Sequence, residues 1–204
     1  KFAGALKTYS CEAMMQDGKA LQFATSHNLG DHFAKAFGIK YLDENNELKF
    51  GWQTSWGLST RSIGGLIMTH SDDKGLVLPP KMAQTAVVII PILLGKEGDE
   101  KIIEESQKIK KTIEGLGYGC KVDQRDLRPG EKFYEWERKG VPIRIEIGPK
   151  DLLAEKIVVV RRDIGEKFDV LINKISEEIP TLLNTIQSDL FNRALEFQKQ
   201  KTKV

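Results

Sequence analysis

Residues 22–30, with the sequence QFATSHNLG, bring together side chains that could bind a polar or anionic ligand. Thr25, Ser26 and His27 lie where an apolar strand pattern gives way to a helical one. Two hydroxyl groups and an imidazole would therefore stand beside the free backbone N–H groups of a helix start. A simpler interpretation is that Ser26 or Asn28 only caps the helix, since both residue types are favoured there.

A second stretch with chemical potential covers residues 52–65, WQTSWGLSTRSIGG. An extended segment meets a helix whose first turn contains Gly64 and Gly65, and glycines allow another group to approach the backbone closely. Arg61 lies at the junction, and its planar guanidinium suits a phosphate group or stacking on a purine. The alternative is that Arg61 is an ordinary surface residue.

A third stretch mixes aromatic and charged residues. Residues 133–139 read FYEWERK, and Arg144, Glu146, Lys150 and Asp151 follow. Aromatic rings can stack on unpaired bases, while carboxylates accept from base amino groups and lysine or arginine donates to guanine O6 and N7. The same composition also fits a charged surface over a small aromatic core.

The glycine-rich run at residues 115–119, GLGYG, looks like a phosphate-binding loop only at first sight. A dinucleotide-binding fingerprint follows a strand and precedes a helix, whereas this run follows a helix and precedes a strand. We interpret it as a helix C-cap and a turn.

The second part of the chain, after residues 79–80, alternates strands and helices in a way that predicts an α/β domain. We expect strands at 85–94, 120–126, 141–147 and 156–162, and helices at 99–116, at 129–139 and from 166 to the end, interrupted at Pro180. The strand at 141–147 alternates apolar and polar residues, so one of its faces should be buried. The order β-α-β-α-β-β-α predicts a compact domain with a mixed sheet.

The first part of the chain predicts the edge of an antiparallel sheet that carries a site. We expect strands at 9–15 and 20–24 joined by a turn at residues 17–18, a helix at 29–37, an extended segment at 50–61 and a helix at 62–69. The chain as a whole is therefore expected to be α+β.

Composition excludes several classes of protein. The 204 residues carry a formal net charge of only +2, so any case for nucleic acid must come from local placement. No apolar run is long enough to cross a membrane, and no secretory signal is visible. Cys11 and Cys120 suit a reducing compartment, and neither they nor the histidines have metal-ligand spacing, so no metal site is expected. Lys1 in place of Met hints that the chain is a piece of something longer.

Four segments resemble prolyl-tRNA synthetases of the archaeal and eukaryotic type, which are class II aminoacyl-tRNA synthetases. They are KFAGA (1–5), QFATSHNLGDHFAKAF (22–37), TSWGLSTRSIGGLIMTHSDDKGLVLPP (54–80) and KFYEWERKGVPIRIEIGPKD (132–151). Threonyl-, histidyl- and glycyl-tRNA synthetases share the two folds but lack the TSHNLG and WGLSTR motifs. The resemblance therefore points to proline.

The resemblance implies three groups of site residues. Residues 57–65 correspond to motif 3 of class II synthetases. The ATP-binding residues would be Gln22, Thr25, Ser59 and Arg61; the walls of the proline pocket would be Phe2, His27, Trp56 and Gly57; and the residues that read the two guanines of proline anticodons would be Glu137, Arg144 and Lys150. In these roles Arg61 would stabilise charge and orient the nucleotide, and His27 would donate or accept a hydrogen bond.

The resemblance also implies a domain organisation and a reaction. Residues 1–80 would be the C-terminal part of the class II catalytic domain, a remnant of its antiparallel sheet; residues 81–183 would be the anticodon-binding domain, and residues 184–204 a C-terminal helix. The expected activity is ATP-dependent activation of proline and transfer to tRNA(Pro). The expected partners are ATP with Mg²⁺, L-proline, tRNA(Pro) and, in the full-length enzyme, a second subunit of a cytoplasmic homodimer.

Departures from the family pattern leave alternatives open. Motifs 1 and 2 would precede Lys1, so these 204 residues alone are expected to be inactive, and the family's zinc-binding domain would follow Val204. Residues 81–86, KMAQTA, differ from the sequence that usually follows the double proline in this family. A non-catalytic RNA-binding module derived from a class II synthetase is one alternative. A different class II specificity is another.

Overall fold

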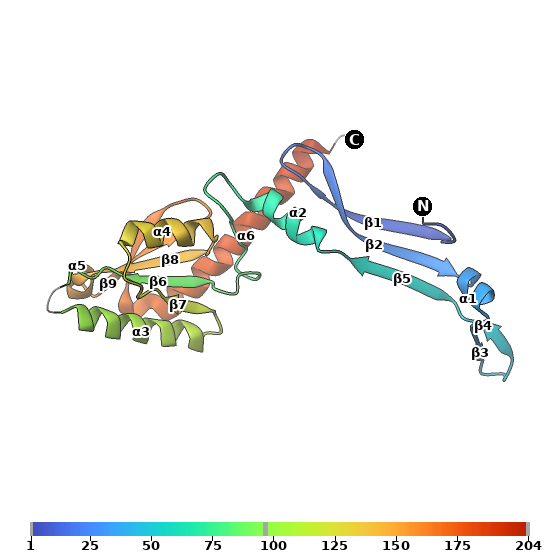
Figure 1. Ribbon diagram of the computed structural model, residues 1–204, viewed down its shortest axis with the longest axis horizontal. Coiled ribbons are helices and arrows are strands. Elements are labelled where there is room, and N and C mark those ends of the chain that lie inside the picture. The colour runs from blue at the N-terminus through green and yellow to red at the C-terminus, as the bar shows by residue number, and fades with distance from the viewer. Residues whose placement is uncertain (1, 96–97, 203–204) are drawn as a thin grey trace. The chain divides into compact units, whose positions relative to one another are not determined.

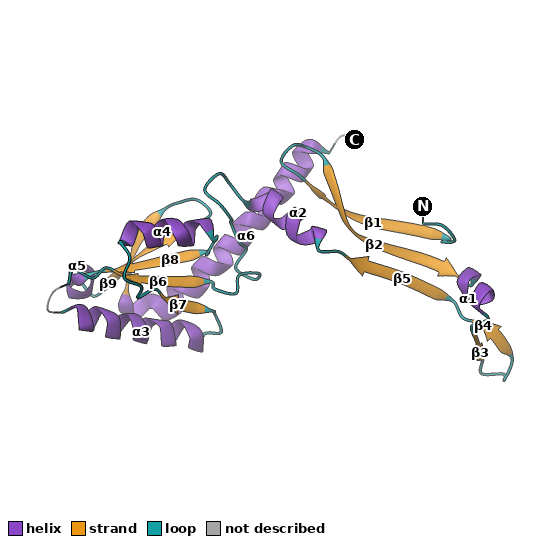
Figure 2. Cartoon of the chain, in the orientation of Figure 1, coloured by secondary structure: helices purple, strands orange, loops and turns teal. Residues whose placement is uncertain are grey.

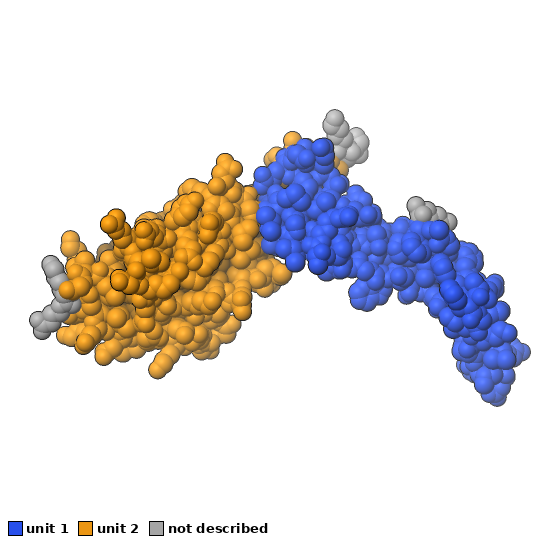
Figure 3. All heavy atoms as spheres, in the orientation of Figure 1, with its two compact units in different colours: residues 1–69 blue, residues 70–204 orange. Residues whose placement is uncertain are grey.

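The computed structural model describes residues 2–95 and 98–202, and the chain forms two compact units, Lys1–Thr69 and His70–Val204 (Figure 3). The terminal residues Lys1 and Val204, on which two sequence expectations depended, lie outside the described residues. Antiparallel and mixed sheets are both present, which confirms the expected fold class. The domain boundaries after residues 80 and 183 stay predictions.

The first unit is built on a three-stranded antiparallel sheet in the order β1-β2-β5 (Figure 1). Its elements are β1 (Lys7–Met14), β2 (Ala20–Gly30), α1 (His32–Phe37), β3 (Lys40–Leu42), β4 (Leu48–Phe50), β5 (Gln53–Leu58) and α2 (Arg61–His70). β3 and β4 form a separate antiparallel hairpin. The turn between β1 and β2 contains Gly18 with a φ of 80°, a conformation that glycine adopts without steric cost.

Strand β2 is longer than expected. It continues to Gly30, and helix α1 begins only after Asp31. The helix-capping interpretation of Ser26 and Asn28 was therefore wrong: Ser26 pairs with Tyr9 on one side and Trp56 on the other, and Asn28 also has partners on both neighbouring strands. Cross-strand pairing on two sides outweighs the local preference of these residues for a cap.

A β-bulge interrupts the pairing of β1 with β2. Cys11 pairs with Ala24, but the next residue, Glu12, pairs with Gln22, so Phe23 is the extra residue. Directly paired residues lie on the same face of a sheet, and residues two apart on β1 share a face. The bulge therefore puts Gln22 on the face that carries Thr25 and His27, which simple alternation along β2 would not do.

The second unit is a five-stranded mixed sheet in the order β10-β9-β8-β6-β7, with helices on both faces (Figure 2). Its elements are β6 (Val87–Pro91), α3 (Asp99–Gly115), β7 (Cys120–Val122), α4 (Pro129–Arg138), β8 (Ile143–Ile147), α5 (Pro149–Leu153), β9 (Lys156–Arg161), β10 (Lys167–Leu171), η1 (Ile172–Lys174) and α6 (Ile175–Lys201). β6 runs parallel to β7 and β8, while β8, β9 and β10 are antiparallel.

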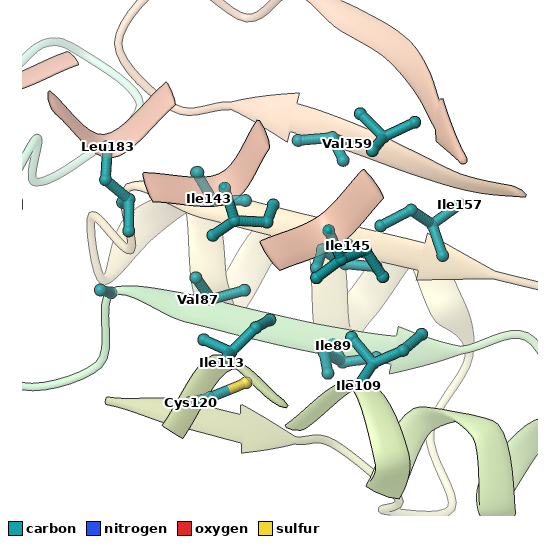
Figure 4. Close-up of a cluster of buried hydrophobic side chains, with 14 of the residues drawn as sticks. Val87, Ile89, Ile109, Ile113, Cys120, Ile143, Ile145, Ile157, Val159 and Leu183 are labelled. Atoms are coloured by element: carbon teal, nitrogen blue, oxygen red, sulfur yellow. The ribbon is translucent and has the colours of Figure 1, made fainter. Parts of the chain in front are cut away.

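The core of the second unit lies mainly between the sheet and helices α3 and α6. Val87, Ile89, Ile143 and Ile145 of the sheet pack there with Ile109 and Ile113 of α3 and Leu183 of α6 (Figure 4). A smaller cluster on the other face joins Val88, Ile90 and Val141 to Phe133 and Trp136 of α4. All five residues of β6 are buried because helices cover both faces of this central strand.

The segment after residue 166 differs from expectation in two details. It begins with strand β10, which pattern analysis missed because this edge strand buries only Val170. Helix α6 then runs through Pro180 without interruption. Buried side chains on either side of the proline, among them Ile179 and Leu183, hold the helix against the core and offset the missing backbone hydrogen bond.

Candidate functional site

The four residues expected to meet ATP line one open pocket in the first unit, which we call the ATP-side pocket. Its volume is about 310 Å³, and it is lined by Gln22, Phe23, Ala24, Thr25, Gly57, Leu58, Ser59 and Arg61. The pocket lies where the bulge of β2 meets the junction of β5 and α2. Strand pairing thus brings together residues from two motifs that are far apart in the sequence.

Two hydrogen bonds to backbone carbonyls of β2 build this junction. The N–H of Ser59 donates to the carbonyl of Phe23 over 3.1 Å, and Nη1 of Arg61 donates to the carbonyl of Gln22 over 3.0 Å. Arg61 is exposed, so most of its guanidinium stays available to a ligand. A Cβ built on Gly57 would meet nothing within 4 Å, which leaves open space beside its cross-strand partner Thr25.

Three of the four residues expected to form the proline pocket share one face of the first sheet or lie against it. Across the strands, Thr8, His27 and Ser55 form one row, and Ser10, Thr25 and Gly57 form the next. The ring of Phe2 lies 4.7 Å from that of His27. This face is lined by hydroxyl groups, an imidazole and a glycine, a surface suited to a small polar ligand.

Trp56 lies elsewhere. It pairs with Ser26, in the row of Tyr9, so its side chain belongs to the opposite face of the sheet from His27. The side chain is 79% exposed. A pocket wall supplied by Trp56 would have to come from its backbone, which runs beside Gly57.

Thr8 is a candidate site residue that sequence reasoning missed. Its Oγ1 lies 3.1 Å from Nδ1 of His27 and accepts a hydrogen bond of 3.2 Å from the N–H of Phe2. The hydroxyl therefore links Phe2 and His27, two of the four residues expected at the proline pocket. Only the register of β1 against β2 shows this contact, because a threonine in a strand is otherwise unremarkable.

In the second unit, Glu137 and Arg144 line a pocket of about 190 Å³ beside helix α4, which we call the α4 pocket. The other lining residues are Lys74, Val88, Phe133, Trp136, Val141, Val160, Arg161, Arg162, Gly165 and Lys167. The lining contains two aromatic rings, five cationic side chains and the carboxylate of Glu137. Such a surface can bind an anionic, planar ligand.

Arg144 is held from two sides. Its Nε and Nη2 donate to Oε1 of Glu146 over 3.0 and 2.9 Å, and its guanidinium carbon lies 4.4 Å from the centre of the Phe133 ring. Lys167 Nζ donates to the same carboxylate oxygen over 3.2 Å. Arg144 and Glu146 alternate with buried isoleucines on β8, which confirms the expected buried face of this strand.

Lys150 is not brought into the α4 pocket. It lies in α5, beyond the end of β8, and is exposed. Its expected partnership with Glu137 and Arg144 therefore stays a prediction.

Glu137 is supported by the segment 71–78, which lies against the end of α4. The N–H of Leu76 donates to the carbonyl of Arg138 over 2.9 Å, and Lys74 Nζ lies 3.6 Å from Oε1 of Glu137. Arg162 binds both carboxylate oxygens of Asp72 and donates from Nε to the carbonyl of Glu137 over 2.8 Å. The Arg162 guanidinium holds the pKa of Asp72 below its usual value.

Asp123 anchors α4 to the sheet. It is 4% exposed and accepts hydrogen bonds from the N–H, Nε and Nη2 of Arg125 and from Nε1 of Trp136. These donors, Arg125 above all, hold the pKa of Asp123 well below its usual range. Nζ of the buried Lys132 donates to the Asp123 carbonyl over 3.2 Å. The aromatic side of the α4 pocket is therefore rigidly placed.

Over residues 2–95 and 98–202 no group of three histidine, cysteine, aspartate or glutamate side chains could hold a metal ion. Within the same ranges, no helix has the length and apolar character needed to span a membrane. Burial raises the pKa of the Cys120 thiol to about 12, so this thiol is not a nucleophile at neutral pH.

Comparison with known protein families matches residues 86–182 to the anticodon binding domain. These residues span β6 to the first part of α6, and they include Glu137, Arg144 and Lys150. The match covers the mixed sheet and the helices that pack on it.

The whole chain is similar to proteins named proline–tRNA ligase. It is 50% identical over 202 residues to the one from Lachnospira eligens, 51% identical over 207 residues to one from Chloroflexus aurantiacus and 52% identical over 204 residues to one from Chlorobium limicola. Each match covers 99% of this chain and 42 or 43% of the relative. The chain thus spans less than half the length of these relatives.

Proposed function

The chain belongs to the prolyl-tRNA synthetase family, and from this premise we propose that it acts as part of a proline–tRNA ligase. The reaction joins the carboxylate of proline to the α-phosphate of ATP, expels pyrophosphate and then transfers the prolyl group to the 3′ end of tRNA(Pro). The first unit would supply one side of the adenylate-forming site. The second unit would read the anticodon.

The observation that carries this proposal is the ATP-side pocket. Gln22 and Thr25 from β2 meet Ser59 and Arg61 from the β5–α2 junction around one hollow. Arg61 would stabilise the negative charge of the nucleotide and orient it, since adenylate formation depends on positioning and electrostatics more than on covalent catalysis. Gly57 leaves room for the ligand beside Thr25.

The proline would lie on the same face of the sheet, against His27 and Phe2. His27 would contribute a hydrogen bond, with its ring held between Phe2 and the Thr8 hydroxyl. No nucleophile is needed, because the carboxylate of proline itself attacks ATP.

Magnesium would enter with the nucleotide. No carboxylate lines the ATP-side pocket, so the described residues do not supply the oxygen ligands that Mg²⁺ prefers. The ion would be held by the phosphates of ATP, and we assign it to no residue of this chain.

The remaining assignments are proposed on the family relationship alone. We take residues 1–80 as the C-terminal part of the catalytic domain, 81–183 as the anticodon-binding domain and 184–204 as a C-terminal helix. We also propose a homodimer in the cytoplasm for the full-length enzyme, and Lys150 as a third anticodon contact. The alternative of a non-catalytic RNA-binding module has no observation in its favour.

The decisive experiment substitutes Arg61 in the full-length protein. We expect Arg61→Ala to abolish proline-dependent ATP–pyrophosphate exchange while binding of tRNA(Pro) stays nearly intact, with Arg61→Lys retaining part of the activity because the charge remains. Equal loss of exchange and tRNA binding in Arg61→Ala would assign Arg61 a folding role instead. Exchange driven better by another amino acid would overturn the specificity.

A further inference from the structure

We propose that Glu146 is a positioning residue that holds Arg144 in the orientation needed to read a guanine base. This inference rests on the proposed function, in which Arg144 contacts an anticodon guanine. No family resemblance assigns Glu146 a role. The two side chains lie on β8 and contact each other directly.

The contacts with Glu146 use the edge of the Arg144 guanidinium formed by Nε and Nη2, and they leave the end formed by Nη1 and Nη2 available. Oε1 of Glu146 accepts from Nε and Nη2 of Arg144. Each Nη atom carries two hydrogens, so one N–H on Nη2 and both on Nη1 have no acceptor among residues 2–95 and 98–202. Those groups form the end of the guanidinium, and they match the O6 and N7 acceptors of guanine, which are read by two parallel N–H donors.

The packing around Arg144 restricts the guanidinium further. Phe133 lies against its face at 4.4 Å, and the side chains of Arg144 and Glu146 are each only 14% exposed. Arg144, Val160 and Lys167 form one row across β8, β9 and β10, and Lys167 donates to Glu146 as well. A long, flexible side chain is thus fixed before any ligand arrives, which lowers the entropy lost on binding.

The negative charge of Glu146 allows its two possible roles to be distinguished. RNA is a polyanion, and Glu146 contacts two of the cationic residues that line the α4 pocket, Arg144 and Lys167, so its negative charge opposes binding of any RNA there. If Glu146 did nothing but contribute this charge, removing it would strengthen RNA binding. If it positions Arg144, removing it weakens recognition of the correct anticodon, and the two roles predict changes of opposite sign.

The test measures binding of the 204-residue chain to two transcripts: tRNA(Pro), and the same tRNA with adenines replacing the two anticodon guanines. We expect Glu146→Ala and Glu146→Asp to reduce the ratio of the two affinities about tenfold, because alanine has no acceptor and aspartate is too short to reach Nε and Nη2. Glu146→Gln keeps an acceptor oxygen at the right distance, and its ratio should stay within about threefold of wild type.

Control measurements distinguish a positioning role of Glu146 from an effect of its charge and from a folding defect. Glu100→Ala removes an exposed carboxylate in the first turn of α3 and should leave the ratio unchanged. Circular dichroism and urea unfolding check that each variant is folded, and the comparison of Asp with Gln stands even if Glu146→Ala fails to fold. A preserved ratio in Glu146→Asp with a reduced ratio in Glu146→Gln would show a charge effect and overturn the proposal.

Arg144→Ala separates failure of this inference from failure of the proposed function. If Arg144→Ala loses discrimination but the Glu146 variants keep it, only the positioning role is overturned. If Arg144→Ala also keeps discrimination, the assignment of Arg144 as a guanine reader is wrong, and the role of Glu146 falls with it.

Discussion

At the scale of single residues, the imidazole of His27 depends on two neighbours. Phe2 lies against its ring, and the hydroxyl of Thr8 fixes one edge through Nδ1. An imidazole held in this way presents its other nitrogen in a defined direction, and the partner of one ring nitrogen determines the role of the other.

We predict that Thr8→Val in the full-length enzyme raises KM for proline about fivefold to tenfold, because a neutral hydrogen bond contributes about 1 kcal/mol and valine keeps the shape of threonine without its hydroxyl. KM for ATP should stay unchanged. Proline-dependent pyrophosphate exchange measures both constants. Thr8→Ser keeps the hydroxyl and should behave as wild type, so an equal defect in both variants would contradict the prediction.

Asp123 makes a second residue-scale prediction, on stability. Asp123→Ala should lower the free energy of unfolding at neutral pH by about 2–4 kcal/mol, because it removes a buried carboxylate that accepts four hydrogen bonds and leaves Nε1 of Trp136 without an acceptor. Urea unfolding gives the value. Asp126→Ala, an exposed carboxylate nearby, should change it by no more than about 0.5 kcal/mol.

The same carboxylate predicts a pH dependence. The folded state holds the pKa of Asp123 below the ordinary value of 3.8, so its contribution to stability is complete above that value and is lost as the pH falls through the folded pKa. Wild-type stability should therefore fall steeply below about pH 4. Asp123→Asn should show a shallower fall over that range, and equal slopes would rule out this carboxylate as a source of the acid sensitivity.

At the scale of elements, the segment 71–78 meets the end of helix α4 through two glycines. Gly75 and Gly140 have φ values of 131° and 73°, and a Cβ on either would lie 2.6 Å from backbone atoms of the opposite segment. Both positions therefore require glycine, for conformation and for space. This close approach lets Leu76 and Leu78 pair with the backbone that follows Glu137.

We predict that Gly140→Ala lowers the free energy of unfolding by about 2–4 kcal/mol, the combined effect of left-handed backbone strain and overpacking. Gly130→Ala is the matched control in α4: its φ is not positive and its Cβ would meet nothing within 4 Å. That control should be neutral or stabilising by up to about 1 kcal/mol. Similar losses in both variants would show that helix propensity, not close approach, dominates here.

At the scale of the whole molecule, the second unit holds its own core and its own supporting segment. Residues from position 70 onward belong to it, including Asp72, whose carboxylate binds Arg162, a side chain that is only 5% exposed. A chain cut at the double proline would lose this partner, although its five strands would remain.

We predict that residues 70–204 fold cooperatively on their own and that residues 81–204 are less stable by about 2 kcal/mol or more, because Arg162 loses its carboxylate and the end of α4 loses its backbone partners. Chemical unfolding of the two truncated chains measures the difference. Equal stability of the two truncated chains would place the boundary of the folding unit at residue 80. It would also show that segment 71–78 links the two units without stabilising the second.

Local sequence patterns determined much of this protein. The β-branched run of β6, the period-two alternation of β8 and the helical spacing of α3 each predicted the right element, since a buried face imposes its period directly on the sequence. The distinctive sequence motifs around His27 and Arg61 indicated the family. These signals lie within single segments, where side chains close in sequence respond to the same surroundings.

Only the tertiary structure decided which of these residues meet. The bulge at Phe23 turns Gln22 to the face of Thr25, the register of β2 and β5 puts Trp56 on the face opposite His27, and Oε1 of Glu146 accepts from Arg144 and Lys167 together. The physical reason is that strand register, bulges and cross-strand neighbours depend on segments far apart in the chain, and a shift of one residue moves every side chain to the other face. Local sequence patterns identify the residues of the candidate site, and long-range strand pairing determines the face of the sheet on which each side chain lies.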